Sequence, residues 1–138
     1  MKKIIILLTT LCFSTFANAE EIKLSFDWGN IPMCTSGKPN IVTNPTFTLS
    51  AIPKDAKWAY FKLQDRNVTN YNHGGGWVEL KGNTTINPGI FEYKSPCPPS
   101  GKHTYRWTAY FTAKKTSLNF SGKPKDIMSD TFASKKYP

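Results

Sequence analysis

The segment that most constrains the fold is an unbroken alternation of side chains after residue 103. Aromatic and small apolar residues share one face of it, namely Tyr105, Trp107, Ala109, Phe111 and Ala113. The residues between them are mostly polar or β-branched, namely Thr104, Arg106, Thr108, Tyr110 and Thr112. A period of two in such residues is typical of a β-strand with one buried face. The pattern therefore predicts a long strand that crosses a sheet.

His103 lies at the mouth of this strand, in phase with the buried residues, and it follows a rigid Pro98-Pro99 pair and Gly101. An inward-facing histidine beside such a loop could form the wall of a pocket. The alternative is a histidine that is hydrogen-bonded to a loop carbonyl. The local sequence leaves both interpretations open.

Further alternating segments predict strands at residues 22–28, 46–50, 57–65 and 77–80, separated by loops rich in Gly, Pro and Asn. Asp65 ends the third of these in phase with its apolar face, so a carboxylate is expected at the inner side of a strand end. Leu118 and Phe120 are expected in a short strand, and residues 125–136 in one terminal helix with a partial apolar face. The pattern as a whole predicts an all-β sandwich of two antiparallel sheets with a short C-terminal helix.

His73 is followed by three glycines, at positions 74–76. Glycine lets the backbone come very close to a neighbouring group. One interpretation is a loop that closes over a pocket beside His73, and the other is a flexible hairpin loop.

The N-terminal residues have the pattern of a secretory signal peptide. Lys2 and Lys3 precede an apolar run at residues 4–16, and Ala17-Asn18-Ala19 forms a small-x-small cleavage site. The run is too short to span a bilayer stably. We expect residues 1–19 to be removed after Ala19 and residues 20–138 to form one domain. A short, lysine-led signal indicates a bacterial protein that is periplasmic or secreted.

Two cysteines, Cys34 and Cys97, remain after removal of the signal, which also carries Cys12. An even pair in an exported protein predicts a disulfide. Two buried thiols are the alternative. The sequence offers no C-x-x-C motif and only two histidines, so no metal site is expected, and no cofactor either.

The chain is basic, and the excess is uneven. Its formal charge of +9 falls to +7 without Lys2 and Lys3, and eight Lys or Arg against two Asp follow from Lys102 onward. Such a surface favours anionic partners such as lipid headgroups or polysaccharide, including peripheral contact with anionic membranes. A purely solubilising charge is the alternative. The absence of RNA-binding and helix-turn-helix signatures argues against a nucleic-acid partner.

Several segments together resemble the phosphatidylethanolamine-binding protein family, which includes Raf kinase inhibitor-like proteins. One is Asp65 ending a strand with a histidine in the next loop. The most specific is Tyr93-x-x-Pro-Cys-Pro-Pro-x-Gly-x-His-x-Tyr, ending at Tyr105. The others are Cys34-Thr35-Ser36-Gly37, Asn40, Pro45, Leu49 and Ile52-Pro53.

The resemblance implies two antiparallel sheets in Greek-key order and a small pocket for an anion such as a phosphate or a phospholipid headgroup. The residues that it assigns to this pocket are Asp65, His73, Pro98, His103 and Tyr105. The chain departs from the family pattern at Asp65-Arg66-Asn67, where the family has Asp-Pro-Asp, and at Thr104, where it has arginine.

The leading functional hypothesis is an exported binding or regulatory protein without catalytic residues. One alternative is a phosphoester hydrolase that uses His73 and His103 as general base and acid. Another is an envelope or host interaction protein with a vestigial pocket. The sequence identifies no protein partner.

Overall fold

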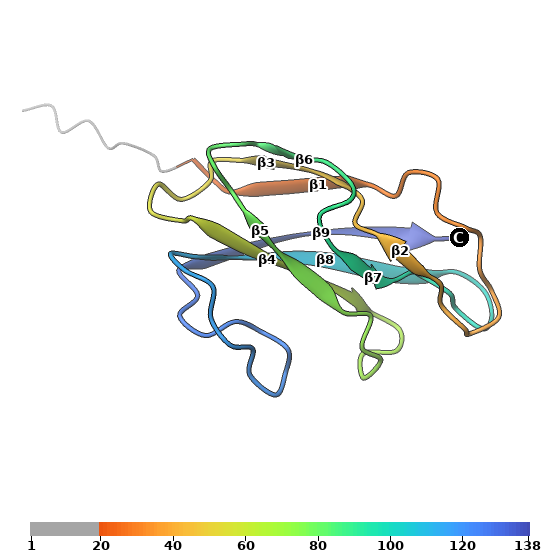
Figure 1. Cartoon of the computed structure of the whole chain (residues 1–138). Helices are drawn as coiled ribbons and strands as arrows, with labels where there is room; N and C mark the ends of the chain where they lie inside the picture. Colours follow the sequence, from red (N-terminus) through yellow and green to blue (C-terminus); the bar gives the residue numbers. More distant parts are fainter. Residues whose placement is uncertain (1–19) are drawn as a thin grey trace, which may run out of the picture.

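The computed structural model describes residues 20–138, which form nine β-strands and no helix (Figure 1). The predicted signal peptide, residues 1–19, lies outside the described part. Within residues 20–138, no helix is long and apolar enough to cross a membrane. The strands are β1 (Lys23–Asp27), β2 (Ile41–Thr43), β3 (Thr46–Ser50), β4 (Trp58–Asp65), β5 (Gly75–Glu79), β6 (Thr85–Ile86), β7 (Glu92–Lys94), β8 (His103–Thr112) and β9 (Ser129–Tyr137).

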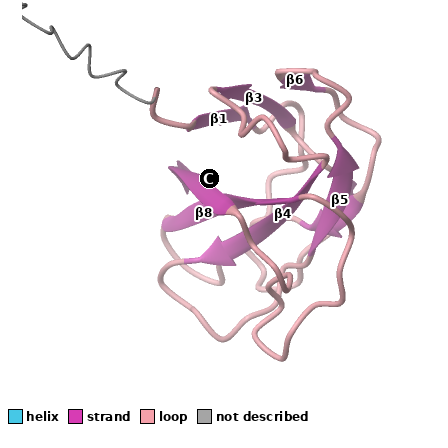
Figure 2. Cartoon of the chain, turned by 90° about the vertical axis from the view of Figure 1, so that its left-hand side faces the viewer, coloured by secondary structure: helices cyan, strands magenta, loops and turns pink. Residues whose placement is uncertain are grey.

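The strands form two stacked layers and a small additional pair, all antiparallel (Figures 1 and 2). One layer has the strand order β1-β3-β6, and the other has the order β5-β4-β8-β9. The pair β2-β7 lies toward one end. The chain crosses between the layers after β3, returns for β6 and crosses again before β8, so the all-β prediction with two main sheets is confirmed.

An aromatic cluster fills the space between the layers. Phe47 of β3 stacks on Phe61 of β4 with ring centroids 4.2 Å apart, and it meets Trp107 of β8 edge-on at 5.1 Å. All three side chains are fully buried. Burial of each such residue contributes roughly 1.5–3 kcal/mol, so this cluster holds the two sheets together. Tyr105, Trp107, Ala109 and Phe111 of β8 are buried, as its alternation predicted. Ala113 instead lies beyond the strand and is exposed, and Tyr110 and Thr112 on the opposite face are buried as well.

The glycines after His73 serve close packing. A Cβ on Gly75 would lie 1.9 Å from the carbonyl oxygen of Phe61, and a Cβ on Gly76 would lie 2.2 Å from Cγ of Phe91. The expected close approach is therefore present. Gly75 and Gly76 nevertheless belong to β5, paired with β4, and do not form a loop that could close over a pocket.

The predicted C-terminal helix is wrong. Residues 129–137 instead form β9, which pairs with β8 from His103↔Tyr137 to Phe111↔Ser129. Without β9, the backbone N–H and C=O groups along one edge of β8 would have no hydrogen-bond partners. Pairing them with residues 129–137 is more favourable than a helix that the sequence pattern supports only weakly. No strand forms at Leu118 and Phe120, where Leu118 makes only an isolated bridge to Pro124. Strands β2 and β6 lie in segments expected to be loops.

Candidate functional site

The pairing of β4 with β8 brings Asp65 and His103 together. Asp65 lies opposite Tyr105 in the antiparallel register, and His103 precedes Tyr105 by two residues on the same face. Oδ2 of Asp65 and Nδ1 of His103 are 2.6 Å apart. Two side chains that are far apart in sequence therefore form one hydrogen-bonded pair at the end of the larger sheet.

The Asp65 carboxylate is held by the following turn as well. Its Oδ1 accepts hydrogen bonds from the backbone amides of Asn67 at 2.8 Å and Val68 at 3.1 Å. Burial alone would raise the pKa of this carboxyl group, but the bonds from His103 and the two amides outweigh burial and lower the pKa. Asp65 is thus a buried but ionised acceptor that orients its neighbours.

His103 is the most exposed member of the predicted site. Its side chain keeps 14% of its exposure, whereas Asp65, His73, Pro98 and Tyr105 are buried. Because the Asp65 carboxylate accepts, Nδ1 carries the hydrogen of this pair. The other ring nitrogen, Nε2, has no hydrogen-bond partner among residues 20–138, so it is the atom that is available to a ligand.

His73 is engaged by the backbone instead. Its Nδ1 lies 2.9 Å from the carbonyl oxygen of Lys94, which can only accept, so the ring hydrogen is committed to that bond. Its ring packs edge-on against Tyr105 at 5.5 Å. Burial is the main cause that lowers the pKa of His73, and a neutral ring with its hydrogen at Nδ1 has no N–H left for an anion.

Tyr105 forms the centre of the cluster. Its ring is 1% exposed and stacks beside His103 with centroids 6.3 Å apart. Burial, and after it the negative charge of Asp65, raise the pKa of Tyr105, so the phenol stays neutral. Asp65, His73, His103 and Tyr105 therefore converge as one group, with Tyr105 between the two imidazoles.

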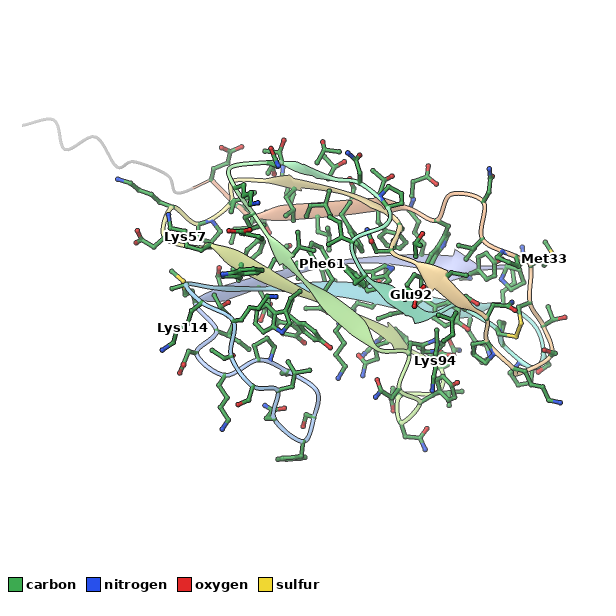
Figure 3. The ribbon with its side chains drawn as sticks, in the orientation of Figure 1. Met33, Lys57, Phe61, Glu92, Lys94 and Lys114 are labelled. Carbon is green, nitrogen blue, oxygen red and sulfur yellow. A yellow bond between two sulfur atoms is a disulfide. The ribbon has the colours of Figure 1, made fainter. Side chains whose placement is uncertain are left out.

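The loop that carries Pro98 is fastened to the rest of the chain. The predicted Cys34–Cys97 disulfide is confirmed, with Cα atoms 4.6 Å apart (Figure 3, yellow bond). Beside it, the amide of Ser95 donates to the carbonyl of Asn40 at 2.8 Å. Pro98 directly follows the disulfide-bonded Cys97 and is fully buried.

A cavity lies beside the His73 edge of the cluster. His73 borders a cavity of about 290 Å³ together with Ile41, Glu92 and Lys94, but Asp65, His103 and Tyr105 do not border it. Among residues 20–138, no group of three or more His, Cys, Asp or Glu is arranged to hold a metal ion.

A larger cleft of about 580 Å³ lies between residues 69–72 and 118–123, over β4. The sequence analysis did not identify it, because both walls come from segments without periodicity. The available signal was Phe120, a large apolar residue in a run of Asn, Ser, Gly and Lys.

No protein-family model and no curated protein matches the sequence. Among solved structures, the chain is similar to a proposed phosphatidylethanolamine-binding protein homologue from Chlamydia trachomatis. The two chains are 15% identical, with a TM-score of 0.58, and the alignment covers 85% of this chain and 97% of the other. The strand pairing described above is thus that of a phosphatidylethanolamine-binding-protein-like fold.

Proposed function

We propose that the protein is an exported binding protein that holds a small anion, a phosphate or a phospholipid headgroup, at Nε2 of His103. The observation that carries this proposal is the 2.6 Å hydrogen bond between Asp65 and His103. A carboxylate that accepts from Nδ1 fixes the ring orientation and turns Nε2 toward a ligand. The likeness in fold to a phosphatidylethanolamine-binding protein homologue supports the same ligand class.

The proposal predicts a pH dependence with a definite sign. In the neutral ring Nε2 carries a lone pair and repels an anion, because the only hydrogen is on Nδ1. Protonation turns Nε2 into a charged donor, which forms the stronger kind of hydrogen bond. Anion affinity should therefore be higher when the ring of His103 is protonated than when it is neutral.

Titration with inorganic phosphate and with phosphorylethanolamine, followed through the imidazole C–H resonances, tests the proposal. His103→Ala should weaken binding by about 1.5–3 kcal/mol, as loss of a charge-assisted hydrogen bond does. Lys102→Gln, which removes a neighbouring exposed charge, is the matched control and should have a smaller effect. Tighter binding of phosphorylethanolamine than of phosphate indicates a headgroup. Unchanged affinity in His103→Ala contradicts the proposal.

The hydrolase alternative requires both imidazoles to reach a substrate. His73 is 3% exposed and its N–H is committed to the carbonyl of Lys94, so it is poorly suited to proton transfer. We therefore favour binding over catalysis. Turnover of an aryl phosphodiester by the wild type, lost equally in His73→Gln and His103→Ala, would reverse this preference.

Export is part of the proposal. A disulfide such as Cys34–Cys97 persists in oxidising compartments and is compatible with the periplasm or the exterior. N-terminal sequencing of protein from its natural compartment should find a chain that begins near Glu20. A chain that retains the first residues would contradict cleavage after Ala19.

A further inference from the structure

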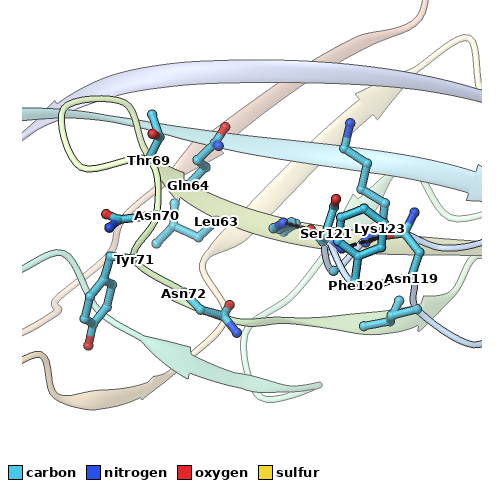
Figure 4. A pocket seen from close by; sticks show the side chains of 13 residues that line it. Leu63, Gln64, Thr69, Asn70, Tyr71, Asn72, Asn119, Phe120, Ser121 and Lys123 are labelled. Carbon is cyan, nitrogen blue, oxygen red and sulfur yellow. Dashed lines mark hydrogen bonds between the residues drawn. The ribbon is translucent and has the colours of Figure 1, made fainter.

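The cleft over β4 is lined by residues other than Asp65 and His103. Its floor is the outer face of β4 at Lys62 and Gln64, one wall is residues 69–72, and the other wall is residues 118–123 (Figure 4). Its volume of about 580 Å³ lies within the range of small-molecule sites, ~300–1,000 Å³.

The cleft is positively charged, and no carboxylate lines it to offset that charge. Lys62 and Lys123 are among the residues that line it, and no aspartate or glutamate is. Neither lysine forms an ion pair within residues 20–138. Burial, and after it the charge of Lys123, lower the pKa of Lys62. Two unpaired cations that repel each other favour an anionic occupant.

The amide side chains of the cleft add hydrogen-bond donors. The oxygen of Gln64 accepts from Arg66 at 2.9 Å, and that of Asn72 accepts from the amide of Gly74 at 2.9 Å. The oxygen of Asn119 accepts from two backbone amides of its own turn. The amide nitrogens of all three are therefore left to donate, and they suit a ligand with many oxygen acceptors.

One wall presents an apolar surface in a rigid frame. Phe120 is completely exposed, at 105% relative accessibility, at the tip of a turn. Hydrogen bonds of Asn119 to Ser121, Gly122 and Lys123 brace this turn, and Nζ of Lys62 donates to the carbonyl of Ser121. Across the cleft, Tyr71 is 37% exposed. An exposed aromatic ring on a braced turn offers a flat face to the C–H surface of a sugar ring.

We propose that this cleft binds an acidic saccharide, whose carboxylates meet Lys62 and Lys123 and whose ring packs on Phe120. A bare phosphate would pair with the lysines but would not contact the aromatic rings. A membrane surface would use Phe120 and the lysines but could not enter a cleft whose amide donors lie between two walls. A carboxylated pyranose uses all three features, and this site is independent of the one at His103.

The probe for the test is trigalacturonate, titrated into the purified protein and followed through backbone amide resonances. Shifts should concentrate at residues 69–72 and 118–123. A neutral trisaccharide should bind at least about tenfold more weakly, because it lacks the charges that pair with the lysines. Trigalacturonate affinity should also fall as salt is added.

Four substitutions test the contacts. Lys123→Gln should weaken trigalacturonate binding about three- to fivefold, as loss of an exposed ion pair does. Phe120→Ala should weaken it about three- to tenfold through loss of the packed ring. Lys125→Gln is the matched charge control from the same segment, and Phe132→Ala is the matched control for an exposed aromatic residue. Both controls should bind as the wild type does.

Three outcomes would overturn the proposal. In the first, tripolyphosphate competes as well as trigalacturonate and Phe120→Ala changes nothing, so that the cleft attracts charge alone. In the second, Phe120→Ala abolishes vesicle binding but leaves trigalacturonate affinity intact, so that the aromatic residue serves a membrane. In the third, Lys125→Gln weakens binding as much as Lys123→Gln does. Results with His103→Ala bear only on the phosphate proposal.

Discussion

The carboxylate of Asp65 and the imidazole of His103 are paired at 2.6 Å, and the pairing exists only because β4 ends where β8 begins. Asp65 also caps the turn that follows β4, through the amides of Asn67 and Val68. One buried carboxylate thus joins a strand pair, a turn and a histidine. Its ionisation should be visible in the stability of the whole domain.

Acid should destabilise the protein through Asp65. Its folded pKa lies below the ordinary value of 3.8, so the ionised form is favoured more in the folded than in the unfolded chain. The resulting contribution to the free energy of unfolding is fully present above pH 3.8 and is lost as the pH falls through the folded pKa. Urea unfolding of Asp65→Asn should show a flatter dependence on pH below about 4 than the wild type does. Asp55→Asn, at an exposed turn, is the control and should keep the wild-type slope.

Removal of the disulfide should cost a large part of the stability. Cys34 and Cys97 are separated by 63 positions, and closing a loop of that size contributes about 4 kcal/mol in the chain-entropy model. The double variant Cys34→Ala/Cys97→Ala should lose that amount in denaturant unfolding. Intact mass after alkylation, with and without reductant, checks the bond itself. Two freely alkylated thiols in non-reduced native protein would contradict it.

A methyl group at Gly76 should not fit beside Phe91. Its Cβ would lie 2.2 Å from Cγ of that ring, so Gly76→Ala should destabilise by about 1–3 kcal/mol through overpacking. The check is a double-mutant cycle. In the Phe91→Ala background the added cost of Gly76→Ala should shrink, because the ring that it strikes has been removed. If Gly76→Ala lowers the free energy of unfolding equally in both backgrounds, the Phe91 ring is not the reason that position 76 requires glycine.

Contact with anionic membranes should depend on the basic surface and not on the His103 site. Vesicles that contain phosphatidylserine should bind the protein at low salt and release it in molar salt, where the Debye length shrinks to about 3 Å. His103→Ala should bind these vesicles as the wild type does. Lys114→Gln/Lys136→Gln, which removes two exposed charges, should bind more weakly. Binding that survives molar salt would contradict an electrostatic mechanism.

The sequence predicted the strands that have one buried face. The alternation of β8 and the phase of Asp65 in β4 placed both ends of the Asp65–His103 pair correctly, because strand periodicity reports which face a side chain takes. The same reasoning failed for β9. Its residues include Thr131, Phe132 and Tyr137, which are common in strands. Together with Ile127 and Met128, however, Phe132 has the spacing of an apolar helix face, and this spacing led to the wrong prediction. The edge of β8, a tertiary feature, decided the outcome.

The cleft could not be predicted in the same way. Its two walls are turns about fifty positions apart in the chain, and only the folded path of residues 113–128 places Phe120 across from Tyr71. Local composition indicates that such turns are polar and exposed, but it does not indicate which turn faces which.

The hydrogen-bond partner of His73 was not predicted for a related reason. The Lys94 carbonyl that holds its ring comes from β7, whose position beside β5 is not encoded locally.

The disulfide has a topological consequence for the intact molecule. It makes residues 34–97 a closed covalent ring that contains the exposed turn after Asp65. A protease that cuts anywhere in that turn leaves a single molecule, whose two pieces separate only when the bond is reduced. The chain can therefore lose a peptide bond in this turn while both pieces stay in one covalently linked molecule.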